Sequence, residues 1–184
     1  NSEIYIDKTE LIAYTNKKLN TEQGYICVSR PRRFGKSMAA NMLTAYYSRG
    51  CDSRELFQGL KMATHPDFEK HLNQYNVIHL NMRDYLTESE NMKQLIQFVE
   101  DDLLDELQQE FSDLRMPRRK TLVKVLEQAF VQYKIPFVFI IDEWDCIFRV
   151  HKSDAVSQKD YLDFLRNLLK DKSYIALAYM TGIL

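Results

Sequence analysis

Positive charge is concentrated just before an expected helix. Residues 29–37 read Ser-Arg-Pro-Arg-Arg-Phe-Gly-Lys-Ser and follow the apolar run 25–28. The segment 38–47 places apolar side chains at helical spacing, and Gly50 suits the end of that helix. The start of a helix carries partial positive charge and normally attracts acidic residues, but here it carries only cations, so we expect a strongly anionic ligand at this point. The cations are Arg30, Arg32, Arg33 and Lys36.

The order of strand, tight loop, Gly-Lys-Ser and helix is typical of a phosphate-binding P-loop. Residues 35–37 fit that motif, whereas Arg30 stands where its first glycine belongs. Pro31 donates no N–H, and the amides of 33–37 remain to cradle a phosphate. The alternative, an exposed basic turn that caps an ordinary helix, leaves the conflict with the helix dipole unexplained. The residues expected to bind nucleotide phosphates are Arg32, Arg33, Phe34, Gly35, Lys36, Ser37 and Met38.

A pair of acidic residues follows the most apolar segment of the chain. Residues 137–145 read Phe-Val-Phe-Ile-Ile-Asp-Glu-Trp-Asp, which predicts a strand buried on both faces of a parallel sheet. Ligands of such sheets bind beyond the carboxyl ends of the strands. We therefore expect Asp142 to hold Mg²⁺ together with the Ser37 hydroxyl, in a Walker B arrangement. Glu143 is expected to orient and deprotonate an attacking water, and the alternative for the pair is a solvated turn.

Strands and helices alternate along the chain, which predicts an α/β fold with a parallel, doubly wound sheet flanked by helices. In P-loop NTPases with an additional catalytic Glu, the final strand lies between the P-loop strand and the acidic strand. Thr181, at the carboxyl end of the final strand, is then expected near the γ-phosphate as a sensor, with an ordinary cap as the alternative. The strands are expected at 25–28, 76–82, 137–141 and 174–180, and the helices at 7–19, 36–47, 66–73, 90–111, 121–133 and 159–170.

Three other local expectations follow from single residues. Asp7 is expected as the N-cap of the first helix, with Glu10 as its capping-box partner. Asp145 is expected as a cap or salt-bridge partner, and Trp144 as a packing residue. The basic connector 115–120 is expected to serve solubility and helix capping, with contact to nucleic acid as the alternative.

The length of 184 residues suits a single domain with a sizeable core, and the two motifs make residues 1–184 the expected nucleotide-binding domain. The net charge of −1 and pI of about 6.5 give no general attraction to nucleic acid or to an anionic membrane. No apolar run approaches the ~20 residues of a membrane-spanning helix. The three cysteines lack disulfide or metal-ligand spacing, and this predicts a cytoplasmic protein. The sequence is expected to be a fragment of a longer protein.

Five segments of the chain resemble the predicted AAA-ATPase-like family, which is found mainly in bacteria and archaea. The resemblance spans nearly the whole chain and makes Arg30 a family feature. It implies an ATPase of AAA+ type that uses ATP and Mg²⁺, commonly attached to a C-terminal nuclease-like domain of the PD-(D/E)XK type, which we expect to be absent from residues 1–184. Family members usually have Tyr in place of Trp144 and often Lys in place of Cys146. The matching segments are 5–9, 29–37, 55–60, 140–145 and 180–184.

The leading prediction is therefore an ATPase that acts as a switch or motor for an attached or partner domain. One alternative is an ATP-binding interaction scaffold without significant turnover. A small-molecule kinase is a second alternative, disfavoured by Glu143 beside Asp142 and by the intervening strand. We also expect this domain to bind DNA only weakly by itself, and the sequence is compatible with an oligomer. The candidates for a transition-state cation are Arg32, Arg33, Arg149 and Arg166.

Overall fold

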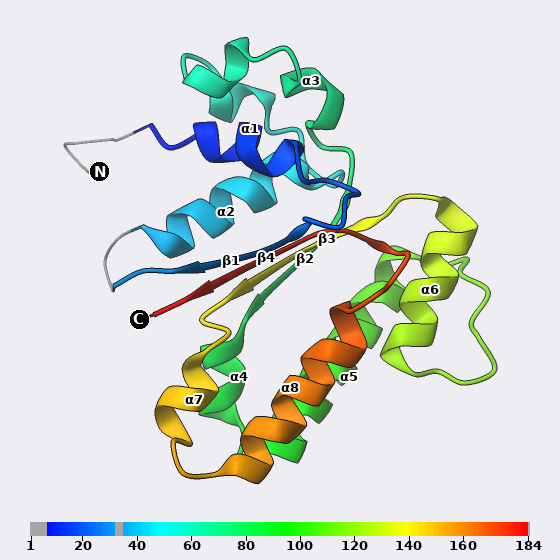
Figure 1. Cartoon of the computed structure of the whole chain (residues 1–184). Helices are drawn as coiled ribbons and strands as arrows, with labels where there is room; N and C mark the ends of the chain where they lie inside the picture. Colours follow the sequence, from blue (N-terminus) through cyan, green and yellow to red (C-terminus); the bar gives the residue numbers. More distant parts are fainter. Residues whose placement is uncertain (1–6, 32–34, 184) are drawn as a thin grey trace.

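The computed structural model describes residues 7–31 and 35–183, which form a four-stranded sheet with all strands parallel (Figure 1). The order across the sheet is β1-β4-β3-β2. All six residues of β3 are buried, as its apolar sequence predicts. The strands are β1 (Tyr25–Ser29), β2 (Asn76–Asn81), β3 (Phe137–Asp142) and β4 (Ile175–Gly182).

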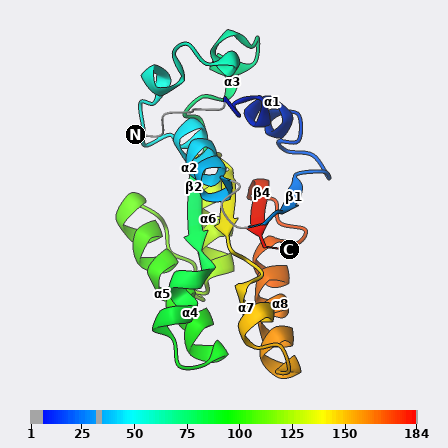
Figure 2. The ribbon, with the colours of Figure 1, turned by 90° about the vertical axis from the view of Figure 1, so that its left-hand side faces the viewer.

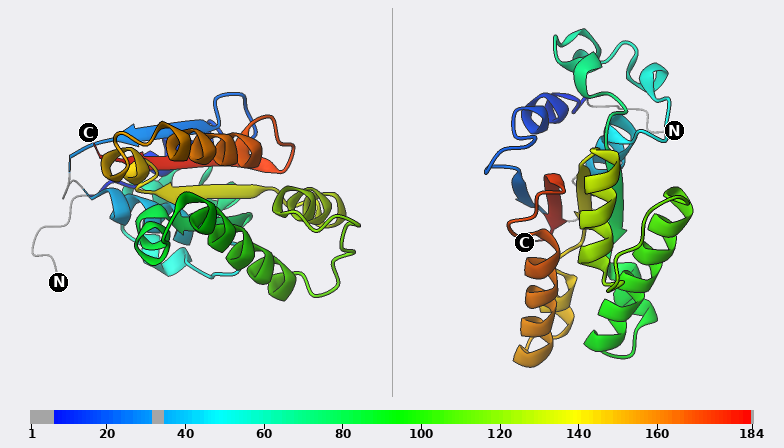
Figure 3. Two further views of the ribbon diagram at one scale, coloured as in Figure 1. Left: turned by 90° about the horizontal axis from the view of Figure 1, so that it is seen from below. Right: turned by 90° about the vertical axis from the view of Figure 1, so that its right-hand side faces the viewer.

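Helices cover both faces of the sheet and form two separate hydrophobic cores (Figures 1, 2 and 3). Alternate residues of β3 point to opposite cores, with Phe139 in one and Val138 in the other. The first core packs under α4 (Met82–Glu88), α5 (Met92–Glu110), α6 (Leu122–Tyr133), α7 (Cys146–Val150) and α8 (Ala155–Leu169). The second packs under α1 (Glu10–Asn16), α2 (Lys36–Tyr47), two 3₁₀ turns, η1 (Arg54–Phe57) and η2 (Lys61–Thr64), and α3 (Phe68–His71).

The helix starts follow local sequence chemistry at several points. The side chain of Asn91 accepts a hydrogen bond from the Gln94 N–H and caps α5. Asp154 caps α8 in the same way, so that this helix begins at Ala155, four residues earlier than the sequence predicts. At the start of α2, Gly35 has a left-handed φ of 75°, which glycine adopts without the steric cost that a Cβ would impose.

The expected capping box at the first helix is wrong. α1 begins at Glu10 after an N-cap, Thr9, that makes no side-chain cap hydrogen bond. The Asp7 carboxylate instead accepts hydrogen bonds from the N–H and Oγ1 of Thr9 and from the Lys61 N–H of η2. Glu10 lies 3.6 Å from the Lys61 ammonium. These polar groups attach the start of the chain to η2 because η2 offers them a backbone donor and a cation.

Two short helices, α4 and α7, occupy positions that the sequence predicts as strand end and loop. α4 begins directly after β2, and the side chain of Asn81 accepts a hydrogen bond from the Arg83 N–H at its start. α7 begins after Asp145 and follows β3 by three residues. Both helices contact each other beyond the carboxyl end of the sheet (Figure 1), and they therefore place side chains next to the ends of β2 and β3.

Candidate active site

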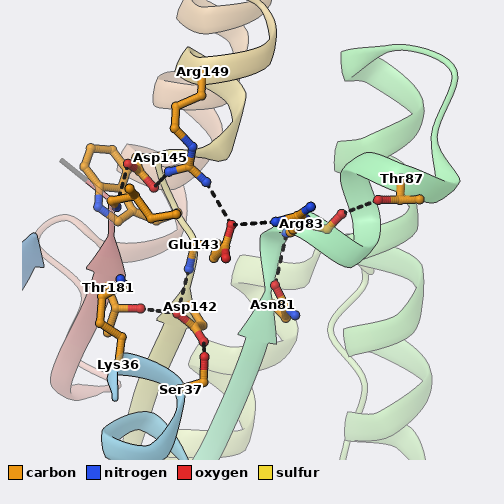
Figure 4. Close-up of polar contacts among 12 residues, drawn as sticks. Lys36, Ser37, Asn81, Arg83, Thr87, Asp142, Glu143, Asp145, Arg149 and Thr181 are labelled. Atoms are coloured by element: carbon orange, nitrogen blue, oxygen red, sulfur yellow. Dashed lines mark hydrogen bonds and ion pairs between the residues drawn. The ribbon is translucent and has the colours of Figure 1, made fainter. Parts of the chain in front are cut away.

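The carboxyl ends of the parallel strands bring the two sequence motifs together. Ser37 lies in the first turn of α2, and its Oγ donates a hydrogen bond of 2.6 Å to Asp142 Oδ2 at the end of β3 (Figure 4). The two residues are 105 positions apart in the sequence. A cavity of about 320 Å³ lies beside this contact, and its lining includes residues 35–38, Arg83 and Glu143.

Asp142 is the centre of a hydrogen-bonded group of side chains. Its Oδ2 accepts from Ser37, while its Oδ1 accepts from the Thr181 hydroxyl and, at 2.9 Å, from the Glu143 N–H. The carboxylate belongs to a residue that is only 5% exposed, so it depends on these donors to replace water. The parallel pairing of β3 with β4 supplies the position of Thr181, since Ile141 is level with Met180.

Lys36 is folded back onto the segment that precedes it. Its ammonium donates hydrogen bonds of 2.9 Å to the Arg30 carbonyl and 2.8 Å to the Pro31 carbonyl. A second cation lies near the start of α2, because the Lys8 Nζ is 3.0 Å from the position that a Cβ on Gly35 would occupy. An anion bound at this helix start would meet the positive end of the helix and these ammonium groups.

Glu143 has a constrained backbone and a carboxylate that two arginines contact. Its φ is 52°, in the left-handed region that non-glycine residues seldom adopt outside special sites. Arg149 Nη2 lies 2.8 Å from Glu143 Oε2, and Arg83 Nη1 lies 3.9 Å from the same oxygen (Figure 4). Both cations thus approach one carboxylate oxygen.

Asp145 connects this acidic turn to the end of β4. Its carboxylate pairs with Arg149 at 2.5 Å and accepts a hydrogen bond of 2.9 Å from the Ile183 N–H. Gly182 permits the approach, because a Cβ there would lie 2.9 Å from the Asp145 Cγ. Asp145 is therefore a salt-bridge partner, as expected from the sequence, and Trp144 packs edge-on against Phe148 as expected.

Cys146 is a buried cysteine at the start of α7. Burial raises the pKa of its thiol to about 11, so the group stays protonated and uncharged near neutral pH. Its N–H donates a hydrogen bond of 3.0 Å to the Glu143 carbonyl. The side chain serves the core beneath the acidic turn and supplies no cation to the site.

The structure places most of the sequence-predicted site residues around one cavity. Its lining includes Gly35, Lys36, Ser37, Met38, Asp142 and Glu143. Thr181 is not part of the lining, but its hydroxyl donates a hydrogen bond to Asp142. Arg32, Arg33 and Phe34 lie outside the described residues.

Among the proposed transition-state cations, Arg149 contacts Glu143, whereas Arg166 lines a different cavity with Tyr25 and pairs with Asp163. Sequence reasoning missed Arg83 and Lys8. Neither belongs to the loop or strand motif that defines the site. Lys8 lies in the family-matching segment 5–9, which was the available signal.

The oxygens of Ser37 and Asp142 fit a magnesium ion. A hydroxyl and a carboxylate are hard oxygen ligands, and Mg²⁺ typically takes one or two such protein ligands with water and phosphate oxygens. Within 7–31 and 35–183, no group of three or more His, Cys, Asp and Glu side chains could hold a metal ion by itself. In the same part of the chain, no helix is both long and apolar enough to cross a bilayer.

The sheet and these contacts define an α/β protein whose polar site lies at the carboxyl edge of a helix-covered parallel sheet. A family model described as "Predicted AAA-ATPase" matches residues 1–184. The chain belongs to this predicted AAA-ATPase family, as the sequence motifs indicated. A search of curated proteins finds no match to the chain.

Proposed function

We propose that this domain binds Mg-ATP at the start of α2 and hydrolyses it as a switch or motor for an attached or partner domain. The observation that carries the proposal is the contact of 2.6 Å between Ser37 Oγ and Asp142 Oδ2. It joins the Gly-Lys-Ser segment to the acidic end of the buried strand, which are the two parts that P-loop ATPases use. Membership of the predicted AAA-ATPase family supports the same class of activity.

The strand order supports the subclass with an additional catalytic Glu. β4 lies between β1, which leads into the loop, and β3, which ends in Asp142. Thr181 at the end of β4 consequently reaches Asp142, in the region where we expect the γ-phosphate. This arrangement disfavours the small-molecule kinase alternative, because we expect a kinase to lack a catalytic base at position 143.

Each site residue has a part in the proposed hydrolysis. Lys36 and the amides at the start of α2 bind the phosphates, and Lys36 exchanges its two carbonyl partners for phosphate oxygens. Ser37 and Asp142 would hold Mg²⁺, and its charge would offset that of the phosphate oxygens. Glu143 accepts a proton from a water that attacks the γ-phosphorus, the bond to the bridging oxygen breaks, and ADP and phosphate result.

The two arginines near Glu143 make its two carboxylate oxygens different from each other. Arg149 and Arg83 both contact Oε2. We therefore assign the second oxygen, Oε1, to the attacking water. The contact with Arg149 fixes the direction of the carboxylate, and this removes part of the entropic cost of orienting a catalytic base.

Three variants of residues with proposed roles in the site test the proposal. Lys36→Ala should abolish the rise in melting temperature that Mg-ATP produces in the parent. Asp142→Ala should weaken the magnesium-dependent binding of ATP. Glu143→Gln retains size and hydrogen bonding but accepts no proton, so it should bind ATP normally while turnover falls roughly 10²-fold or more. Unchanged hydrolysis by Glu143→Gln would remove Glu143 as the base.

The scaffold alternative has one observation in its favour. Glu143, the proposed base, is held by Arg149 at 2.8 Å, and a protein that binds ATP without turnover would retain such a pair. A parent protein that binds Mg-ATP with the mutational pattern above, but releases no phosphate, either alone or in its full-length form, would establish the scaffold. We place the output of either activity in an attached or partner domain, with weak DNA binding by residues 1–184 alone.

A further inference from the structure

Arg83 is a cation in the cavity of the proposed ATP site that neither motif contains. It comes from α4 and lines the cavity with Lys36, Ser37 and Asp142. Figure 4 shows its side chain directed from the β2 side toward Glu143. The approach follows from strand register, because Asn81 at the end of β2 is level with Asp142, and Arg83 follows Asn81 by two residues.

The backbone of Arg83 is fixed while its side chain is held weakly. Its N–H donates to the Asn81 side chain at 3.2 Å, and its carbonyl accepts from the Thr87 hydroxyl at 2.9 Å (Figure 4). Its guanidinium approaches Glu143 only to 3.9 Å, beyond hydrogen-bond distance, and the side chain is 57% exposed. An exposed ion pair of this kind contributes little stability, so the guanidinium is available for a stronger anion.

Arg149 and Arg166 are less suited to meet a phosphate in this cavity. Arg149 divides its guanidinium between Glu143 at 2.8 Å and Asp145 at 2.5 Å, and its side chain is 27% exposed. Arg166 pairs with Asp163 and lines another cavity. Of these three arginines, Arg83 combines a place in the cavity with a weak existing partner.

We propose that Arg83 is a further catalytic residue, which leaves Glu143 when ATP binds and contacts the γ-phosphate. This inference rests on the proposed function. During attack by water, the bond between the γ-phosphorus and the bridging oxygen breaks, Glu143 receives the water proton, and negative charge increases on the leaving ADP oxygen. The Arg83 guanidinium stabilises the transferring group and its equatorial oxygens, and the products are ADP and phosphate.

Loss of Arg83 therefore has two separable effects. ATP should lose affinity while ADP, which has no γ-phosphate, should keep it. Turnover should fall further, on the order of 10³-fold, as it does when an arginine that contacts the transferring phosphate is removed. Arg83→Lys should restore the binding preference better than the turnover, because an ammonium carries the charge without the planar pair of donors.

The first experiment titrates ATP and ADP in a Glu143→Gln background, where hydrolysis is suppressed. Arg83→Ala is added to that background. The matched control is Arg119→Ala, which replaces an exposed arginine in the loop between α5 and α6. We expect Arg83→Ala to lower the ratio of ATP to ADP affinity about tenfold, the equivalent of a charge-assisted contact. Arg119→Ala should leave the ratio unchanged. Because Glu143 is already neutralised, an effect of Arg83 through that carboxylate is excluded.

The second experiment measures phosphate release by Arg83→Ala and Arg83→Lys in the otherwise unmodified protein, with thermal unfolding to confirm that each variant is folded. If the protein binds both nucleotides and Arg83→Ala leaves the ratio of ATP to ADP affinity unchanged, the role of Arg83 is overturned and the proposed function is not. A fall in turnover without a change of that ratio would mean that Arg83 only positions Glu143, and this also overturns it. Absence of ATP binding in the parent overturns the proposed function and Arg83 with it.

Discussion

The hydroxyl of Thr181 supports the carboxylate on which the proposed magnesium site depends. Thr181 is fully buried, and its Oγ1 donates to Asp142 Oδ1. Replacement by Val retains the branched shape and removes the hydroxyl. In Thr181→Val, Oδ1 keeps only the Glu143 N–H as a donor, while Oδ2 keeps Ser37. The substitution thus withdraws one hydrogen bond from a buried carboxylate and opens no cavity of consequence.

The expected loss follows from the charge and burial of the acceptor. A hydrogen bond to a charged group contributes about 1.5–3 kcal/mol, and a buried acceptor left without its donor bears the desolvation cost. We therefore expect Thr181→Val to lower the free energy of unfolding by about 2 kcal/mol. For a chain of this size that corresponds to a fall in melting temperature of about 4–8 °C.

The assay is thermal unfolding of the parent, Thr181→Val and Thr181→Ser without nucleotide. Thr181→Ser keeps a hydroxyl and should recover most of the loss. A Thr181→Val protein as stable as the parent would refute the structural part assigned to this hydroxyl. The same variants with saturating ATP or ADP test the sensor part: a sensor predicts that Thr181→Val loses more of the stabilisation by ATP than of that by ADP.

Two further substitutions test the loop and the pH dependence. Gly35→Ala places a Cβ at φ 75° and 3.0 Å from the Lys8 ammonium; we expect it to cost about 1–2 kcal/mol of stability and to weaken ATP binding, and unaltered ATP affinity would refute the close approach. Partial desolvation lowers the pKa of His79 from 6.5, a shift that the charge of Asp142 opposes. The unfolded chain then binds the proton more readily, so the free energy of unfolding should fall as the pH drops below about 6.5. In His79→Gln, the melting temperature measured across that pH range should change less with pH. An unchanged slope in His79→Gln would assign the effect to other groups.

Strong periodic signals in the sequence account for the parts of the fold that were predicted. The apolar run of β3 and the amphipathic pattern of α5 are local properties, so their positions agree with expectation to within a few residues. α4 was missed because, apart from its Asn81 cap, the contacts that hold it are tertiary. Its Met82 is fully buried, and its Tyr85 hydroxyl donates to Asp102 of α5. Neither contact has a signature in the seven residues of the helix.

The site shows the same division between local motif and spatial neighbour. The Gly-Lys-Ser loop and the Asp-Glu pair are contiguous, so their chemistry can be predicted from residue type and order. Arg83 reaches the site through the register of β2 on β3, and Lys8 through the attachment of its neighbours Asp7 and Thr9 to η2. Strand register depends on the packing of the whole sheet, and the spacing of charged residues along the sequence does not reveal it.

The family-matching segment at the end of β4 gains a physical explanation from its contacts. Thr181 donates to Asp142 through its hydroxyl and accepts from the Trp144 N–H through its carbonyl, at 3.1 Å. Two residues on, the Ile183 N–H donates to Asp145, and the lack of a side chain at Gly182 allows that approach. The end of β4 therefore contacts the residues on both sides of Glu143, and Asp145 in turn forms an ion pair with Arg149. A turn fixed in this way can keep Glu143 at a φ of 52°, because several contacts outweigh the strain of one residue.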